Sequence, residues 1–479
     1  MSLQSARQLV LGFHPALPVV VEESAARLSS DGGLLVIREF DARRDFTARF
    51  AAALEDVRDP TFTWHRMVSL VRQRVYGLLA DYEDQNDHTE LRHDPVFQLL
   101  CDRLPGDAAL ASQPTLSRFE NAVTIADLKR LREFLLDEFL DSFDSPPVRI
   151  TLDLDAFDDE THGQQQLTMF HGFYEQYQYL PIAITCAETD AVVLVGLRHG
   201  TCAAFLGADD DLRLITTRIR ERWPDVEIGV RADSGFGVPV MYDVCEELGL
   251  TYTFGFSMNA RLQRKTQPLL DQAVQQYEAT QQKQRLFDLF EYQADSWPQS
   301  RTVIVKCEAH AAGTNRRAIV TNRSGATVLP QGTYDEYVQR GESENRNKEL
   351  KNGLHADRLS DHRFVANFFR LFLHTAALNL LVQLRRATTQ SPTPVELGVV
   401  DPVPAAALSE RSKKRFCNRR RQRDPLGEGQ PCTWRSRLIK VAVEVVFSTR
   451  RVLVKLASSW PHARDLFRLG HQVALGGSG

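Results

Sequence analysis

The order of strands and helices predicted between residues 148 and 257 constrains the fold more than any other feature of the chain. Short apolar or alternating segments bounded by turn residues mark the strands, and apolar residues at helical spacing mark the helices. Strands joined by a tight turn are antiparallel and strands joined by a helix are parallel, so the order predicts a mixed α/β sheet. The predicted strands are 148–157, 177–188, 191–200, 226–233 and 251–257, and helices over 210–224 and 239–248 separate the last three of them.

A mixed sheet with this order, flanked by helices, is typical of the ribonuclease-H-like fold, in which the first and fourth of these strands are neighbours. The chain has 479 residues, which is too long for one ordinary core. Changes in pattern predict a helical N-terminal domain (1–145), two parts of the sheet domain (146–262 and 334–387), a β-rich insertion between them (263–333), and a linker with a basic C-terminal region (388–479).

Composition narrows the possible partners. The formal net charge is only -4, so any binding of nucleic acid must come from local basic patches. The seven cysteines include no C-x-x-C pair, which argues against a thiolate zinc site and a disulfide framework and indicates a reducing cytosol. The sequence has no apolar run of about 18 residues and no N-terminal secretion signal, so we expect no membrane partner.

Three aspartates lie at strand positions where α/β proteins form sites. Asp153 and Asp155 share one face of the first predicted strand, and Asp233 ends the fourth. Sites form at the carboxyl ends of strands, so Asp155 and Asp233 are expected side by side. Adjacent carboxylates repel unless a cation neutralises them, and Mg²⁺ prefers such oxygen ligands. The alternative is that each aspartate only caps a turn, as aspartates at strand ends usually do.

The segment YVQRGESENRNKELK (337–351) shows a second pattern. On one continuous helix, Tyr337, Arg340, Glu344 and Lys351 would fall within roughly 60° of one another. Glu344 would then supply a third carboxylate. A plainer interpretation is a solvated helix, in which Arg340 and Glu344 form an ordinary i,i+4 ion pair.

The spacing Y-x2-R-x3-E-x6-K in that segment resembles the Tyr-Arg-Glu-Lys signature of DDE transposases from bacterial insertion sequences. Four motifs together are similar to the group 1 DDE transposase domain, and the resemblance extends over nearly the whole chain. They are LDLDAFDDETHGQQQ (152–166), RADSGFG (231–237), YVQRGESENRNKELK (337–351) and DRLSDHRFVANFFRL (357–371).

The resemblance implies that Asp155, Asp233 and Glu344 bind catalytic Mg²⁺, for which Mn²⁺ can substitute. It also implies that Tyr337, Arg340 and Lys351 contact DNA phosphates near the bond that is cut, which suits the chemistry of Arg and Lys. Two positions depart from the family pattern. Phe157 stands where a Thr is expected, and Asn347 stands where an apolar residue is expected.

Further DNA contacts are expected outside these motifs, each with a plainer alternative. Ser117 and Arg118 lie in QPTLSRFEN (113–121), either the second helix of a helix-turn-helix or a short packing helix. Trp297 either stacks on a flipped base or, more commonly for an aromatic residue, lies in the core. A basic run is either a phosphate-binding tail or merely solvated, and its residues are Lys413, Lys414, Arg415, Arg419, Arg420 and Arg421.

The resemblance implies a cut-and-paste DNA transposase that acts in the bacterial cytoplasm, associated with the nucleoid when bound to DNA. Two protomers would bind the terminal inverted repeats, cut the DNA in a metal-dependent reaction and join it to target DNA, with a hairpin intermediate as one route. Two other functions stay open: a ribonuclease-H-like nuclease without strand transfer, and a domesticated DNA-binding protein that has lost catalysis.

Overall fold

The computed structural model describes residues 8–325, 328–388 and 430–475. Its centre is an eight-stranded mixed sheet with the order β12-β13-β14-β11-β10-β4-β8-β9. Strands β4, β10 and β11 run parallel to one another, and every other pairing in this sheet is antiparallel. The strands are β4 (Arg149–Ala156), β8 (Ile182–Cys186), β9 (Val192–Gly196), β10 (Glu227–Ala232), β11 (Thr251–Phe256), β12 (Gln284–Tyr292), β13 (Arg301–His310) and β14 (Gly313–Thr321).

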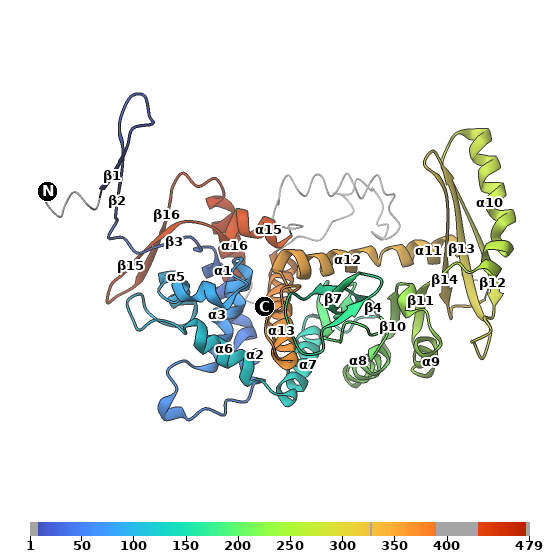
Figure 1. Cartoon of the computed structure of the whole chain (residues 1–479), viewed down its shortest axis with the longest axis horizontal. Helices are drawn as coiled ribbons and strands as arrows, with labels where there is room; N and C mark the ends of the chain where they lie inside the picture. The colour runs from blue at the N-terminus through green and yellow to red at the C-terminus, as the bar shows by residue number, and fades with distance from the viewer. Residues whose placement is uncertain (1–7, 326–327, 389–429, 476–479) are drawn as a thin grey trace.

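The mixed α/β sheet predicted from the sequence is confirmed, with two differences in its strands. Residues 177–188 form two strands, β7 (Gln176–Tyr179) and β8, because Pro181 between them has no N–H to continue a ladder. The other difference lies in the segment 263–333, predicted as a β-rich insertion, where β12 was not predicted as a separate strand. The segment begins within helix α10 (Ala260–Thr280), and β12 to β14 extend the edge of the central sheet beside it (Figure 1).

Helices cover both sides of the sheet. Helices α8 (Ala208–Arg222) and α9 (Pro239–Glu247) pack on one side, where they share a hydrophobic core with the buried residues of β4, β10 and β11. On the other side lie α11 (Pro330–Val338) and α12 (Gly341–Lys348), and α12 contacts β4 and β8. Figure 1 shows α11 and α12 running along the edge of the molecule toward the insertion.

The expectation of one continuous helix over residues 334–351 is wrong. Helix α11 ends at Val338, α12 begins at Gly341, and a π-helical turn covers Glu349–Gly353. At the first break the backbone makes tight i to i+3 hydrogen bonds, from Arg340 N to Tyr337 O at 3.0 Å among others. Gly341, a weak helix former, directly follows this break. Tyr337 therefore lies on α11, Arg340 in the break, Glu344 on α12 and Lys351 in the π-helical turn.

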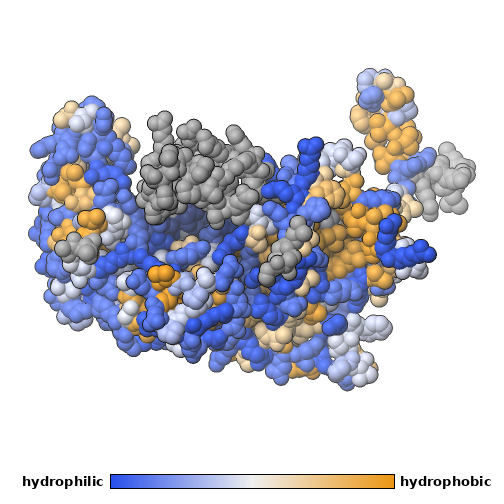
Figure 2. Space-filling model, turned by 180° about the vertical axis from the view of Figure 1, so that it is seen from behind, coloured by the Kyte–Doolittle hydropathy of each residue, from blue (hydrophilic) through white to orange (hydrophobic). Residues whose placement is uncertain are grey.

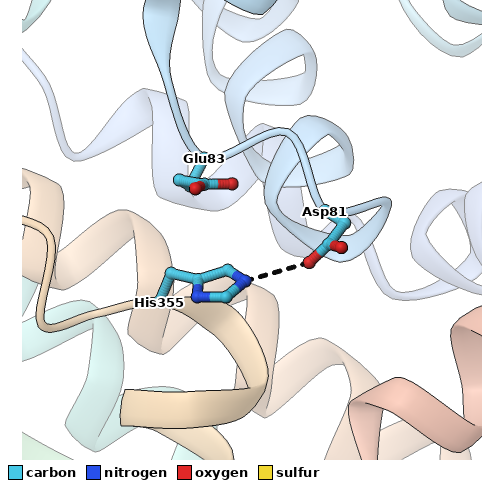
Figure 3. A group of neighbouring side chains, drawn as sticks. All are labelled: Asp81, Glu83 and His355. Carbon is cyan, nitrogen blue, oxygen red and sulfur yellow. Dashed lines mark hydrogen bonds and ion pairs between the residues drawn. The ribbon is translucent and has the colours of Figure 1, made fainter.

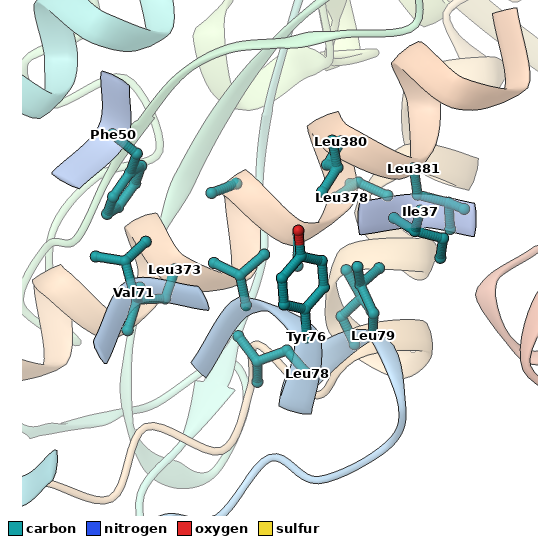
Figure 4. Close-up of a cluster of buried hydrophobic side chains, with 14 of the residues drawn as sticks. Ile37, Phe50, Val71, Tyr76, Leu78, Leu79, Leu373, Leu378, Leu380 and Leu381 are labelled. Atoms are coloured by element: carbon teal, nitrogen blue, oxygen red, sulfur yellow. The ribbon is translucent and has the colours of Figure 1, made fainter. Parts of the chain in front are cut away.

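Helix α13 (Phe364–Thr388) lies inside the protein and joins the sheet to the N-terminal helices. It packs against α2 (Phe46–Ala52), α3 (Met67–Leu79) and α7 (Ile125–Leu140) in one apolar core (Figure 4). Among the described helices it is the one long and apolar enough to span a membrane, but 89% of its most apolar window is buried within the protein. This burial is that of a core helix.

Polar contacts reinforce the core around α13. The carboxylate of Glu120, on α6 (Gln113–Ala122), accepts hydrogen bonds from Arg74 Nε and from Arg370 Nε on α13, both at 2.6 Å. The two guanidinium groups outweigh the burial of Glu120, and its pKa falls to about 2. The remaining N-terminal helices are α1 (Leu34–Arg44), the 3₁₀ turns Pro60–Phe62 and Gln85–Asp87, α4 (His88–Leu91) and α5 (Pro95–Leu100).

The C-terminal region folds against the N-terminal one. A hairpin of β15 (Val443–Phe447) and β16 (Val452–Leu456) pairs with β3 (Leu28–Ser29), and Val443 and Val445 are buried in the core around α13. A second hairpin, β1–β2, projects from the body and exposes apolar side chains (Figures 1 and 2). The elements here are β1 (Gln8–Leu11), β2 (Val19–Glu22), α15 (Pro431–Trp434), the π-helical turn Arg435–Ile439 and α16 (Ala463–Leu475).

A buried ion pair fixes the register of the two strands at the centre of the sheet. Arg231 on β10 pairs with Asp153 on β4, and its Nε and Nη2 atoms donate to the two carboxylate oxygens at 2.7 Å each. Its Nη1 atom donates to Glu336 O at 2.8 Å, which ties α11 to the sheet. Both side chains are almost fully buried.

We predict that Arg231→Met destabilises the protein by about 3–5 kcal/mol, because it leaves the buried carboxylate of Asp153 unpaired. The double variant Arg231→Met/Asp153→Leu should recover most of this loss, since it removes both charges. Urea unfolding measures both effects. Arg213→Ala, which breaks an exposed bidentate pair with Glu247, is the matched control and should leave the unfolding midpoint unchanged. Equal destabilisation by the single and double variants would contradict the role of the pair.

Candidate active site

Parallel pairing of β4 and β10 brings the two predicted aspartates together where the carboxyl ends of these central strands meet, which we call the sheet edge. The register pairs Asp153 with Arg231 and Leu154 with Ala232, and Asp155 and Asp233 are the next residues of the two strands. Asp233 is held at the start of a 3₁₀ turn (Ser234–Phe236), where its Oδ1 atom accepts a hydrogen bond from Gly235 N at 2.8 Å. The carboxyl-end placement predicted for both residues is what the fold produces.

Asp153 and Asp155 point to the same side of β4 but have different surroundings. The bidentate contact with Arg231 occupies both oxygens of Asp153, which is 1% exposed. Asp155 is only partly buried, and its Oδ2 atom accepts one side-chain hydrogen bond, from Asn347 Nδ2 at 2.9 Å. Of the two, Asp155 is therefore the carboxylate with capacity to bind a further ligand.

Helix α12 supplies the third carboxylate and a positioning contact. Glu344 is about half exposed and accepts a hydrogen bond from Arg340 Nη2 at 2.9 Å. Three residues further along α12, Asn347 is buried and donates to Asp155. The sequence suggested an apolar side chain at this position, but the amide fixes the orientation of a candidate metal ligand. The other departure from the family pattern, Phe157, is a core residue at 7% exposure.

The surroundings of Asp155 disfavour its charged form. Burial raises the pKa of Asp155 to about 6, and the charges of Asp233 and Glu344 contribute to the rise. Arg340 and the hydrogen bond from Asn347 oppose the rise without cancelling it. A hard divalent cation would relieve this repulsion and prefers carboxylate oxygens, so the donor set fits Mg²⁺ or Mn²⁺.

Tyr337 and Arg340 lie next to these carboxylates. The Arg340 Cζ atom is 5.9 Å from the centre of the Tyr337 ring, and Tyr337, Asp155, Glu344 and Asp233 all act electrostatically on the guanidinium. A Cβ atom at Gly255 of β11 would lie 2.8 Å from the Tyr337 hydroxyl and 2.7 Å from Ser234 N. Only glycine allows β11 to pass so close to the tyrosine and the turn after Asp233.

Lys351 lies apart from this group. It belongs to the π-helical turn after α12, and its Nζ atom forms an ion pair with Asp158 Oδ1 at 2.8 Å. A contact between Lys351 and a phosphate therefore requires that the ammonium leave or share Asp158. The structure brings together Tyr337, Arg340 and Glu344 as expected, with Lys351 one segment further along.

The other predicted DNA contacts have varied environments. Arg118 on α6 is exposed and Ser117 is partly exposed, so both are accessible. Trp297 is 5% exposed and packs against Tyr242, Phe256 and Tyr292. This burial supports the core alternative for Trp297 and leaves no face for a base. The predicted contacts Lys413, Lys414, Arg415, Arg419, Arg420 and Arg421 lie outside the described residues.

Three residues around the site were not predicted. Arg231 follows the apolar core of a strand, and only its register opposite Asp153 shows its role. Asn347 was noted as unusual, yet its partner lies 192 positions away. Tyr174 is at the tip of a small hairpin, and the negative charges of Asp158, Asp233 and Asp155 add to the effect of burial in raising its pKa. An aromatic-rich segment, FHGFY (170–174), was the available signal for Tyr174.

A separate acidic cluster lies between the N-terminal helices and the segment after α12 (Figure 3). Within the described part of the chain, Asp81, Glu83 and His355 form the group of three whose ligand atoms all lie within 4.8 Å of one another. Asp81 already contacts His355 Nε2 at 3.0 Å and Arg435 Nη1 at 2.7 Å, and Glu83 pairs with Arg358. The guanidinium groups of Arg435 and Arg358 balance the two carboxylates, so the cluster joins segments and is a weaker metal candidate than the sheet-edge site.

The sequence model of the family described as transposase DDE domain group 1 matches residues 14–395. No curated protein matches the chain. Among solved structures, one similar chain is the piggyBac transposase, in a cryo-EM synaptic complex with hairpin DNA, with 11% sequence identity and a TM-score of 0.41 over 86% of this chain and 82% of that one. The family match covers most of the chain, so this protein belongs to the transposase DDE domain group 1 family and is a DNA transposase.

Proposed function

We propose that this transposase cuts and joins DNA at a metal site formed by Asp155, Asp233 and Glu344. The observation that carries the proposal is the convergence of these carboxylates from β4, β10 and α12 at one edge of the sheet. The order of the strands, with β4 between antiparallel β8 and parallel β10, also supports the ribonuclease-H-like assignment. In that arrangement the carboxyl ends of the central strands face the substrate.

The three carboxylates would hold Mg²⁺, with Mn²⁺ as a substitute. When bound, such cations supply activation of the attacking water or 3′-hydroxyl and stabilisation of the leaving oxygen. Asn347 holds the Asp155 carboxylate in one orientation, which reduces the reorganisation needed to bind a cation. A bound cation would also offset the burial of Asp155 and the charges of Asp233 and Glu344, which together raise the pKa of Asp155.

Arg340 is the residue best placed to bind the phosphate that is cut. Its Nη2 atom contacts Glu344, whereas its Nη1 atom is buried and has no hydrogen-bond partner among the described residues. A free guanidinium donor beside carboxylates that bind metal fits a phosphate oxygen. The Tyr337 hydroxyl, which faces β11 and the turn after Asp233, would accept or donate a second hydrogen bond to the DNA backbone.

The wider reaction that we propose is cut-and-paste transposition of an insertion sequence. Two protomers would bind the terminal inverted repeats, in part through Ser117 and Arg118 and through the basic residues 413–421, and bring the two ends together. Each site would cut its DNA end, with or without a hairpin intermediate, and join the 3′-hydroxyl to target DNA. The reaction would take place in the bacterial cytoplasm on double-stranded DNA.

We predict that Asp155→Ala, Asp233→Ala and Glu344→Ala each reduce DNA cleavage by more than about 100-fold while binding to DNA ends is retained. Glu342→Ala, an exposed carboxylate on the same helix, is the matched control and should cleave normally. Cleavage is measured on a plasmid that carries the element's ends, and strand transfer on pre-cleaved ends mixed with a target plasmid. Cleavage without any joined product would indicate a nuclease. Wild-type protein that binds DNA but is inert with Mg²⁺ and Mn²⁺ would indicate a DNA-binding protein.

The contact between Asn347 and Asp155 generates a separate prediction. Asn347→Leu should weaken the apparent affinity for Mg²⁺ by about 10- to 100-fold, as loss of groups that orient metal ligands usually does. Cleavage measured against Mg²⁺ concentration should shift to higher concentration, and saturating Mg²⁺ should restore most of the rate. Asn345→Leu on the same helix is the control. An unchanged Mg²⁺ dependence in Asn347→Leu would show that the hydrogen bond has no positioning role.

The raised pKa of Asp155 predicts a pH-dependent cost to stability. Its folded-state pKa of about 6 exceeds its ordinary value, so its charged form destabilises the fold, with the full cost above about pH 6 and none below about pH 4. Asp155→Asn should therefore stabilise the metal-free protein by about 1–3 kcal/mol at pH 7.5 and have little effect at pH 4. Thermal unfolding at the two pH values measures the difference. An equal effect at both values would contradict the assignment.

A further inference from the structure

The hairpin between β4 and β8 presents aromatic side chains to solvent beside the candidate active site. Strands β6 (Met169–His171) and β7 form the hairpin, and the short strand β5 (Asp159–Glu160) pairs with the other side of β7. Four aromatic side chains of this hairpin are exposed. Their exposed fractions are 51% for Phe170, 84% for Phe173, 39% for Tyr174 and 58% for Tyr177.

The base of this hairpin is anchored to the rest of the protein, whereas its tip is exposed. Tyr179 is completely buried, donates its hydroxyl to Gln166 O at 2.6 Å and packs its ring 5.7 Å from Phe364 of α13. The backbone of Gln166 in turn donates to His362 O at 2.9 Å. The aromatic rings at the exposed tip therefore do not pack in the hydrophobic core.

The rings at the tip support one another. Phe173 and Tyr174 pack edge to face, with centroids 5.1 Å apart at 88°, and the ring of His171 lies 5.0 Å from that of Tyr174. The turn is tight, since Glu175 N donates to His171 O at 2.8 Å and Glu175 adopts a positive φ of 56°. This packing orients Tyr174 and leaves most of the Phe173 ring free.

Three observations place the tip beside the site. Strand β4, which carries Asp155, runs directly into this hairpin. Gln176, the first residue of β7 after the tip, donates to Asp158 Oδ2 at 3.3 Å, and Lys351 pairs with the other oxygen of the same carboxylate. The carboxylates of Asp233 and Asp155 also act on the phenol of Tyr174. DNA bound at the carboxylates would therefore meet these rings.

We propose that Phe173 and Tyr174 form a stacking site for an unpaired nucleobase of the DNA next to the phosphate that is cut. Every base has a π face, so an aromatic ring binds an unstacked base with little dependence on sequence, and each such contact strengthens binding substantially. The assignment rests on the proposed function, because that function brings DNA to the adjacent carboxylates. Base stacking was one alternative for Trp297, but Trp297 is buried, whereas Phe173 and Tyr174 are exposed.

The test uses two fluorescein-labelled DNA duplexes with the same stem. One is closed by a hairpin that carries an unpaired 2-aminopurine beside the stem, and the other is blunt with the 2-aminopurine paired. Binding is measured by anisotropy in Ca²⁺, and stacking by quenching of 2-aminopurine. The variants are Phe173→Ala, Tyr174→Ala and Phe173→Trp, and the control is Phe467→Ala on α16, an exposed aromatic residue of the C-terminal region.

The proposal requires that wild-type protein and Phe173→Trp quench the unpaired base, whereas Phe173→Ala does not. Phe173→Ala and Tyr174→Ala should each weaken binding of the hairpin-ended duplex by about 5- to 100-fold and change binding of the blunt duplex by less than about twofold. Unchanged quenching in Phe173→Ala, an equal loss for both duplexes, or the same loss in Phe467→Ala would overturn it.

Cleavage of a plasmid carrying the element's ends, measured with the same preparations, separates this site from the proposed function. Wild-type protein that cuts DNA while Phe173→Ala still quenches would refute the stacking site and leave the function standing. Wild-type protein that quenches through Phe173 but never cuts would refute the function and leave the stacking site standing. Failure of wild-type protein to bind either duplex would refute both.

Discussion

Arg231 and Asp153 face each other across parallel strands β10 and β4, and their bidentate ion pair is almost fully buried. The pair has three consequences for the site. It sets the register that makes Asp155 and Asp233 neighbours, it neutralises the one further carboxylate on that side of β4, and it holds the end of α11 through Glu336 O. Because removing one partner of a buried pair is costly, a shift of register by one residue would lose both the pair and the site.

At this end of the sheet, burial is the largest cause of the raised pKa of Asp155, and the charges of Asp233 and Glu344 add to it. Arg340 and the amide of Asn347 act in the opposite direction. Across the break between α11 and α12, Arg340 contacts Glu344 while Tyr337 packs against β11 at Gly255. A cation bound by these carboxylates would relieve the cost of keeping Asp155 charged.

Much of this arrangement follows from patterns that are local in sequence. Alternating strands and helical spacing predicted the mixed sheet, and strand ends located Asp155 and Asp233, because both signals need only neighbouring residues. The contact between Arg340 and Glu344 was predictable for the same reason, because the two residues are only four positions apart. What failed depended on distant contacts: the helix break at Arg340 and strand β12 at the outer end of the sheet. For Trp297, burial under Tyr242 and Phe256 decided between the two alternatives that the sequence left open. The role of Asn347 could not be predicted, because its partner on β4, Asp155, is distant in the sequence.

We propose that the sheet-edge carboxylates, and not the acidic cluster at Asp81, bind the catalytic cation. Anomalous scattering from a crystal of the protein soaked with Mn²⁺ measures this directly. We expect Mn²⁺ peaks between Asp155, Asp233 and Glu344, with Arg340 turned toward any bound phosphate. Mn²⁺ found only at Asp81, Glu83 and His355, or no ordered Mn²⁺ near Asp155, would contradict it.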